Sequence, residues 1–348
     1  MTSWTAESFE NPDSGAGPYP VSMARTRIPD DILSAAHERA RARAALDWPE
    51  ADRLRGVIEA AGWKVVDRGT DFGLTPAVPA DVAEDTLVRY GTSKNVPSRL
   101  DEPTIGLATV VLIATDHPQD LDRTLAALRA HAPTGTSIVV VADAPSDEQS
   151  LSLESEATGM VDARIPVEIV WTSERLGHAA AINIGIRRAT APIVVLLDTS
   201  IEPTGDLVTP LVQALDDSSV AVAGGWGITS ADLRHFEDAP AGDVDAIEGY
   251  CQAFRRGDAA ERGPLDERFR FYRNLDIWWS LALRDAGEGE SPRRAVRVDG
   301  LPVARHDHRG WASLPDDERD RQSKRNFYRI IDRFGARLDL LTATRDGD

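Results

Sequence analysis

The chain has 348 residues, of which 42% are hydrophobic and 28% are charged, a composition typical of soluble globular proteins with a large core. Its formal net charge of −18 would repel a phosphate backbone, so nucleic acid is not the expected main partner. The single cysteine excludes a disulfide within the chain and a cysteine-rich metal site.

The amino-terminal stretch has no basic segment followed by an apolar core, so we expect no signal peptide. The longest apolar run, around residues 107–114, is far shorter than the roughly 20 residues of a membrane-spanning helix. We therefore expect a cytoplasmic protein without a membrane span. Residues 1–28 are rich in Gly, Pro, Ser and acids, which predicts a disordered tail.

Residues 29–76 are expected to form a helical hairpin module. Apolar residues at helical spacing predict one helix after Asp31 and a second after Pro49, which Gly62 would end. A short strand over residues 63–66 and a turn over 68–73 should follow. The segment RARAALDWPEADRLRGVIEAAGWKVVDRGTDFGLTP resembles the small carboxy-terminal helical module of bacterial cysteinyl-tRNA synthetases, over residues 32–76. No catalytic signature of a synthetase is present, so the module is expected to pack or to dock a protein partner.

Residues 77–104 contain several prolines and are predicted to be a linker. From residue 105 to 312, strands and helices are expected to alternate, which predicts an α/β fold with a mainly parallel sheet flanked by helices. Residues 313–348 should form a charged carboxy-terminal helical brace and a tail. The expected strands are 107–113, 138–142, 165–171, 193–197 and 220–223, and the expected helices begin near Asp116, Gly177 and Leu207.

The stretch from Trp171 to Pro203 is the most informative part of the chain. A helix that opens at Gly177 is followed by an unbroken apolar run, Ile193 to Leu197, typical of a strand buried on both faces. The run stops at Asp198. Ligands of open α/β sheets bind beyond the carboxyl ends of strands, so Asp198 is expected at a ligand site, although it could also simply cap the strand.

Several common signatures are absent from the sequence. It contains no Walker-type phosphate loop, no G-x-G-x-x-G at a helix start, no zinc-protease motif and no nucleophile elbow. These absences argue against a kinase, a dehydrogenase and a serine hydrolase.

Blocks spread over residues 105–335 resemble the family 2 glycosyltransferases. They are VADAPSD ending the second strand, GHAAAINIGI, LLDTSIEP, EGYC and GPLDERF, in the order found in that family. The resemblance implies the GT-A (nucleotide-diphospho-sugar transferase) fold and an inverting transfer of a sugar from a nucleoside diphosphate to an acceptor hydroxyl. It places the donor nucleotide sugar against Thr115, Asp116, Asp143, Gly177, Asn183 and Asp198, and the acceptor against Glu248, Gly249 and Trp278.

Two departures from the family pattern affect the chemistry. The second acid of the D-x-D pair is Ser200, so a divalent cation, Mg²⁺ or Mn²⁺, would depend on Asp198 together with Glu202 or His308. His306 and His308 would lie on one face of a strand, where they could bind a metal, an anion or nothing.

The other departure lies at the acceptor end. The family's E-D-x-D segment reads Arg273-Asn274-Leu275-Asp276, and an amide cannot accept the acceptor's proton as a carboxylate can. Asp276 and Asp266 are therefore the candidate bases, and Glu248 is a further one. The alternative is that Asn274 caps a helix and Asp276 only favours its positive end.

The sequence thus predicts a glycosyltransferase whose donor is a nucleoside diphosphate sugar and whose acceptor is a saccharide or lipid-linked saccharide. The alternative is a non-catalytic nucleotide-sugar-binding or scaffold protein with a degenerate site. RNA binding by the hairpin is a third, less favoured hypothesis, because acids and bases nearly balance there.

Overall fold

The computed structural model describes residues 28–342 apart from 69–70, 85–86, 115, 159–163, 288–289 and 310–313. The chain divides into two compact units between Val78 and Pro79. The tail expected over residues 1–28 falls almost wholly outside the described residues. No helix in the described part of the chain is both long and apolar enough to cross a lipid bilayer.

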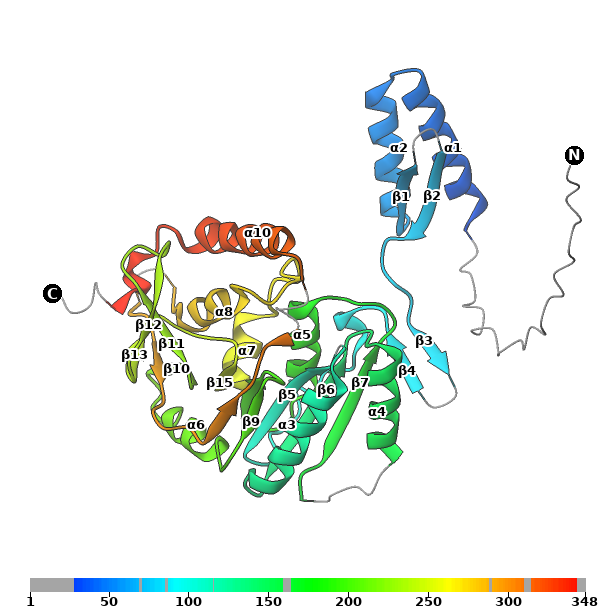
Figure 1. The fold of residues 1–348 in the computed structure, drawn as a ribbon. Helices are drawn as coiled ribbons and strands as arrows, with labels where there is room; N and C mark the ends of the chain where they lie inside the picture. Colours follow the sequence, from blue (N-terminus) through cyan, green and yellow to red (C-terminus); the bar gives the residue numbers. More distant parts are fainter. Residues whose placement is uncertain are drawn as a thin grey trace, which may run out of the picture. The chain divides into compact units, whose positions relative to one another are not determined.

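The first unit is a helical hairpin followed by a β-hairpin (Figure 1). Asp47 caps the second helix by accepting a hydrogen bond from Glu50 N at 3.2 Å. The bidentate pair of Arg39 and Asp67, at 2.9 and 3.1 Å, fastens the first helix to the first strand. The elements are α1 (Asp30–Ala44), α2 (Trp48–Ala60), β1 (Trp63–Arg68) and β2 (Asp71–Pro76).

The strand β2 differs from the turn that we expected over residues 68–73. Its sequence, DFGLTP, has the composition of a turn, but all six of its residues pair antiparallel with β1. Ladder pairing satisfies its backbone groups and outweighs the local preference.

The second unit is built on a ten-stranded mixed sheet (Figure 1). Its order is β13-β16-β10-β15-β8-β5-β6-β7-β4-β3, and the adjacent strands from β8 to β4 are all parallel. The antiparallel β15 separates this block from the parallel pair β10 and β16. The strands are β3 (Val82–Glu84), β4 (Leu87–Tyr90), β5 (Ala108–Ala114), β6 (Thr136–Ala142), β7 (Val167–Thr172), β8 (Ile193–Leu197), β10 (Val220–Gly224), β13 (Gly242–Val244), β15 (Cys251–Arg255) and β16 (Arg294–Arg297).

The linker expected over residues 77–104 is instead part of the second unit, which begins at Pro79. In its second half, Val96 is buried and Arg99 N donates to Arg187 O. Strand β4 joins the sheet in parallel with β7, pairing Arg89 with Trp171 and Tyr90 with Thr172. Strand β3 pairs antiparallel with β4 and closes that edge. Both strands are too short to show a clear alternating pattern. The nearby prolines therefore led us to predict a linker.

Helices cover both faces of the sheet. Alternation along β5 sends Val111 into one core and Val110 and Leu112 into the other. The first core is covered by α5 (His178–Arg188), α7 (Arg256–Arg262), α8 (Leu275–Arg284) and α10 (Asp316–Phe334). The second is covered by α3 (Pro118–His131), α4 (Asp147–Thr158) and α6 (Val208–Ala214).

Shorter elements complete the unit. Strand β9 (Ile201–Pro203) pairs with β17 (Val303–Arg305), and β11 (Gly227–Ser230) lies between β12 (Phe236–Ala239) and β14 (Ala246–Ile247). The 3₁₀ turns are η1 (Ser93–Asn95) and η2 (Leu338–Leu340). Helix α10, in the region expected to be a brace, buries Ile330 and Phe334 in the core beside α8.

This topology determines where ligands can bind. Strands β5, β6 and β8 are parallel neighbours, so their carboxyl ends meet at one edge of the sheet. Asp116, Asp143 and Asp198 follow these ends. The edge is therefore acidic, and the loops and helix starts around it form the candidate site.

Candidate active site

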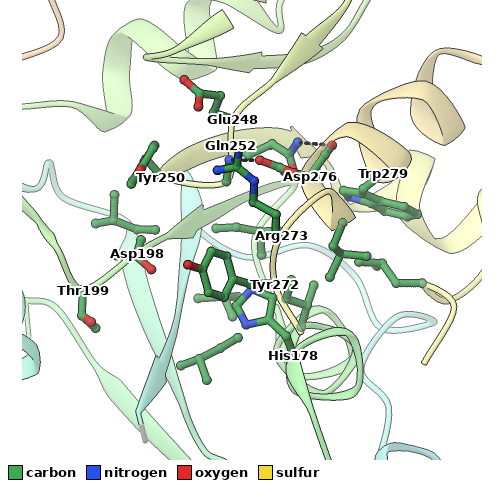
Figure 2. A pocket seen from close by; sticks show the side chains of 18 of the residues that line it. His178, Asp198, Thr199, Glu248, Tyr250, Gln252, Tyr272, Arg273, Asp276 and Trp279 are labelled. Carbon is green, nitrogen blue, oxygen red and sulfur yellow. Dashed lines mark hydrogen bonds between the residues drawn. The ribbon is translucent and has the colours of Figure 1, made fainter. Parts of the chain in front are cut away.

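Two connected pockets lie at this edge. The inner pocket, of about 100 Å³, reaches between the sheet, α5 and α8, and Figure 2 shows its side chains. The outer pocket, of about 350 Å³, lies over the ends of β5 and β6. Both are lined by Ile113, His178, Asp198, Thr199, Tyr272 and His308.

Asp198 is the carboxylate that the pockets share. One of its oxygens accepts hydrogen bonds from the backbone N–H and the hydroxyl of Ser200, and the other lies 3.2 Å from Nε2 of His308. Burial raises the pKa of Asp198, but the hydrogen bond and charge of His308 outweigh it and the pKa is lowered. Burial opposes protonation of His308, but its contacts with Asp198 prevail and its pKa is raised. The pair therefore favours a carboxylate beside an imidazolium.

The two histidines of the H-x-H segment bind different carboxylates. His306 lies 2.7 Å from Glu202, and Arg123 lies 3.8 Å from the same carboxylate. Glu202 lines neither of these pockets, so its expected role as a metal ligand stays a prediction that the geometry does not support. Among the described residues no group of three or more His, Cys, Asp or Glu side chains is arranged to hold a metal ion. Asp198 and His308 remain as a two-donor set.

Asp143 holds the turn that opens α5. Its carboxylate accepts hydrogen bonds from Leu176 N at 2.7 Å, Gly177 N at 3.0 Å and Thr172 Oγ1 at 3.2 Å. Burial is the largest influence on its pKa and raises it despite these bonds. Gly177 has φ 101°, and a Cβ there would lie 2.8 Å from Arg270 Cα, so the turn requires glycine. Both residues line the outer pocket.

The other residues that we expected to contact the donor are not all placed at the site. Asp116 lines the outer pocket and pairs with Arg175 at 3.0 Å. Thr115 lies outside the described residues. Asn183 is buried and lines neither pocket, because its amide binds both N and O of Leu265 and the carboxylate of Glu267. The structure therefore gives Asn183 the role of fixing the loop before α8, and its expected donor contact stays a prediction.

Asp276 lies in the first turn of α8 and lines the inner pocket (Figure 2). Its carboxylate accepts hydrogen bonds from Gly249 N at 2.8 Å and from Ile277 N at 3.0 Å. Burial raises its pKa above the usual range of an aspartate. Glu248 and Gly249 line the same pocket, and burial, followed by the charge of Asp276, raises the pKa of Glu248.

The geometry of α8 separates Asn274 from Asp276. Asn274 is in the left-handed conformation, with φ 67°, and its side chain makes no capping bond. Instead, its Nδ2 donates to Ser323 O of α10 at 3.0 Å. The interpretation of Asn274 as a capping side chain is wrong, and Asp276, in the first turn of the helix, faces the pocket.

Two further expectations are corrected here. Asp266 lines neither pocket and pairs with Arg268 across one turn, so it is not placed as a base. Trp278 packs between Phe269 and Phe334 in the core, with ring centroids 5.6 and 6.2 Å apart, and lines neither pocket. The next residue, Trp279, lines the inner pocket instead.

Other lining residues were missed by the sequence analysis. His178 opens α5, and burial lowers its pKa to about 4, so it is neutral at pH 7. Tyr250 and Tyr272 bring two phenols to the wall, and Arg273 brings a cation. His178 and Tyr250 stand inside the blocks GHAAAINIGI and EGYC, which is the signal that could have identified them.

Comparisons with known proteins concern mainly the second unit. Residues 109–263 match the model of the family Glycosyl transferase family 2. GalNAc-T7, solved with UDP, GalNAc and Mn²⁺, has a similar structure with a TM-score of 0.50 and 16% identity, covering 67% of this chain and 48% of that chain. The mannosyltransferase PcManGT from Pyrobaculum calidifontis, solved with GDP-Man and Mn²⁺, has a TM-score of 0.50 and 17% identity, covering 71% of each chain.

A separate short match involves a synthetase. Cysteine--tRNA ligase 1 of Burkholderia lata is 48% identical over 40 residues, which is 12% of this chain and 8% of that protein. The chain thus spans less than a tenth of that relative and about half of GalNAc-T7. The second unit therefore has the GT-A fold, and residues 109–263 within it match the family 2 glycosyltransferase model.

Proposed function

We propose that this protein is an inverting glycosyltransferase. It moves a sugar from a nucleoside diphosphate sugar to a hydroxyl of a saccharide or lipid-linked saccharide acceptor. The acceptor oxygen attacks the anomeric carbon as the bond to the diphosphate breaks, and Asp276 takes the hydroxyl proton. Nucleoside diphosphate and the glycosylated acceptor are the products.

The observation that carries this proposal is the placement of two carboxylates on one pocket. Asp198, beyond the end of β8, and Asp276, in the first turn of α8, both line the inner pocket. Asp198 also lines the outer pocket, where we place the donor diphosphate. Asp276 does not line the outer pocket. A base that lies apart from the leaving group is the arrangement that a single displacement with inversion requires.

The surroundings of Asp276 suit a base. Burial raises its pKa, which makes the carboxylate more basic than an exposed aspartate, and two backbone N–H groups fix its orientation. General-base assistance of this kind typically contributes about 10² to 10⁴ in rate.

A divalent cation fits the donor side. Asp198 would hold it with its carboxylate, and His308 would add a neutral imidazole once it had released the proton that its pairing with Asp198 stabilises. Mg²⁺ in phosphate sites often has only one or two protein ligands besides phosphate oxygens and water. When bound, such a cation would neutralise charge on the departing diphosphate. Ser200 stays hydrogen-bonded to Asp198 and helps to orient it.

A non-catalytic nucleotide-sugar-binding protein remains the second candidate, because Ser200 and Asn274 replace acids of the family pattern. Donor consumption by the wild type and by Asp276→Asn separates the two. A catalyst should consume one nucleotide sugar, and the variant should bind it equally well while consuming it much more slowly. Donor binding with no consumption by either protein, in the presence of Mn²⁺ and a panel of saccharide acceptors, would favour the binding protein.

A further inference from the structure

Among the residues that the structure describes, one arginine of the outer pocket has no carboxylate partner. The described arginines that line this pocket are Arg175, Arg270 and Arg309. Arg175 pairs with Asp116 at 3.0 Å, and Arg309 lies 3.4 Å from Asp120. The guanidinium of Arg270 contacts only backbone carbonyl groups in the described part of the chain. Its positive charge is therefore available to an anion in the pocket.

Arg270 is held in place by its side chain and by its backbone. Its Nη2 donates to the carbonyl oxygen of Arg175 at 3.1 Å, and its Nε donates to that of Leu176 at 3.4 Å. Its own carbonyl oxygen accepts a hydrogen bond from His178 N at 3.0 Å, at the start of α5. Its Nη1 makes no hydrogen bond to a described residue, which leaves donors for a ligand. A side chain that is already ordered loses less entropy when it binds.

The first N–H groups of α5 are not available to an anion. Such groups at a helix start often bind phosphate. Here, Gly177 N donates to the carboxylate of Asp143 at 3.0 Å. The next two N–H groups, those of His178 and Ala179, donate to backbone carbonyl oxygens of the loop that carries Arg270. An anion at this end of the pocket therefore depends on a side chain for its contacts.

The acids of the outer pocket do not neutralise Arg270. Asp116, Asp120 and Asp198 each pair with another cation, and Asp143 accepts backbone hydrogen bonds. Asp307 is the remaining acid on this pocket; it is exposed and has no ion-pair partner among the described residues. Its charge opposes anion binding, so its removal should only favour an anion at Arg270.

The proposed transfer raises the negative charge that the outer pocket must hold. The acceptor oxygen forms a bond to the anomeric carbon, and its proton goes to Asp276. The bond from that carbon to the β-phosphate oxygen breaks, and its electron pair stays on the phosphate. The diphosphate thus gains one negative charge, and a positive charge fixed beside it stabilises the transition state more than the bound donor.

We propose that Arg270 binds the diphosphate of the donor in the outer pocket and stabilises the charge that develops there as the sugar leaves. The inference rests on the proposed glycosyltransferase function and adds a residue to its donor site. Ser200 replaces the second acid of the D-x-D pattern, which leaves fewer carboxylates for a divalent cation. Arg270 is a cation that belongs to the protein, so part of the affinity for diphosphate should remain without metal.

Calorimetric titration of the full chain with nucleotides in EDTA tests this without turnover. UDP is compared with UMP, and GDP with GMP, because each pair differs only in the second phosphate. We expect the wild type to bind the diphosphate of one pair at least about tenfold more tightly than its monophosphate, the effect of one charge-assisted hydrogen bond. Arg270→Gln should bring that ratio to within about twofold of one and keep the affinity for the monophosphate. With Mn²⁺ and a donor that is consumed, Arg270→Gln should lower kcat at least about tenfold.

Two variants control for the loss of charge and for changes in the same pocket. Arg268→Gln removes the same charge two residues away, where the side chain pairs with Asp266 and lines neither pocket. It should leave the diphosphate preference and kcat unchanged. Asp307→Asn alters the outer pocket without removing a cation, and it should keep or raise the diphosphate preference.

The outcomes are distinct from those that test the proposed function. A diphosphate preference that survives in Arg270→Gln, equal losses of diphosphate and monophosphate affinity, or a wild type that prefers diphosphate only when Mn²⁺ is added would overturn the inference. An unchanged kcat would overturn the stabilising role of Arg270 in the transfer. Each of these results leaves the transferase proposal standing. If neither UDP, GDP nor any nucleotide sugar binds, with or without Mn²⁺, both proposals fail.

Discussion

The outer and inner pockets share Asp198 but are built from different parts of the fold. The outer pocket is bounded by loops whose charged side chains pair with one another, such as Asp116 with Arg175 and Arg309 with Asp120. The inner pocket is walled by strands and by the buried helices α5 and α8. A polar loop surface suits a nucleotide diphosphate, whereas a rigid wall with a fixed carboxylate suits the reacting groups.

The largest expected effect tests the inner pocket. Replacing Asp276 with asparagine should lower kcat by about 10² to 10⁴ while donor binding is retained, because the base is lost and the donor contacts are not. Turnover and donor titration of the same preparation measure the two quantities. The control is Asp266→Asn, which alters an acid that lines neither pocket. Equal losses in both variants would refute the assignment of Asp276 as the base.

The next effect tests the outer pocket and its cation. Asp198→Asn should weaken Mn²⁺ binding in the presence of UDP or GDP by more than about tenfold, since one of two protein donors is lost. Glu202→Gln should change it by less than twofold, because Glu202 is paired with His306 and faces neither pocket. Titration of free Mn²⁺ by electron paramagnetic resonance measures both. A larger loss in Glu202→Gln would restore Glu202 as a ligand.

The pH profile of kcat distinguishes a buried base from an exposed one. Burial raises the pKa of Asp276, so acidification should protonate it at a higher pH than an ordinary aspartate. Below that pKa the rate should fall about tenfold per pH unit. The residual activity of Asp276→Asn should lack this acid limb, which Asp266→Asn should keep. A wild-type rate that is flat down to the ordinary aspartate range would contradict the raised pKa.

The smallest effect concerns the support of α8. Asn274→Ala removes the bond to Ser323 and places a non-glycine residue at φ 67°, whereas Asn274→Gly removes only the bond. We expect the alanine variant to be less stable than the glycine variant by about 1 kcal/mol in urea denaturation. Equal stabilities would show that the left-handed conformation at this position carries no cost.

The outer and inner pockets also differ in how well the sequence predicted them. Asp143 and Asp198 follow apolar runs that read as buried strands, and parallel topology brings their ends together, so the outer pocket was largely predictable. The part of the inner pocket that α8 forms was not predictable. Helix α8 is buried on nearly every side, so its apolar pattern could not tell Trp278 from Trp279. Their spacing from Asp276 would have helped, since Trp279 lies on the same face at i+3.

Contacts between distant segments account for the other errors. Asn183 belongs to a block that lines the donor site in the family that this sequence resembles. Here its amide is hydrogen-bonded to Leu265 and Glu267, more than 80 residues away. Glu202 pairs with His306, which follows strand β17, the partner of β9. Strand β4 exists because β7 offers it an edge. None of these pairings leaves a local pattern in the sequence.

The most direct test of the central claim follows the anomeric proton of the product. The protein with Mn²⁺ is incubated with a panel of α-linked UDP- and GDP-sugars and saccharide acceptors, and the anomeric configuration is read by NMR beside the release of nucleoside diphosphate. We predict that one donor is consumed to give a β-linked product, and that Asp276→Asn does so at least about 10²-fold more slowly. An α-linked product, or undiminished transfer by Asp276→Asn, would contradict a single displacement with Asp276 as its base.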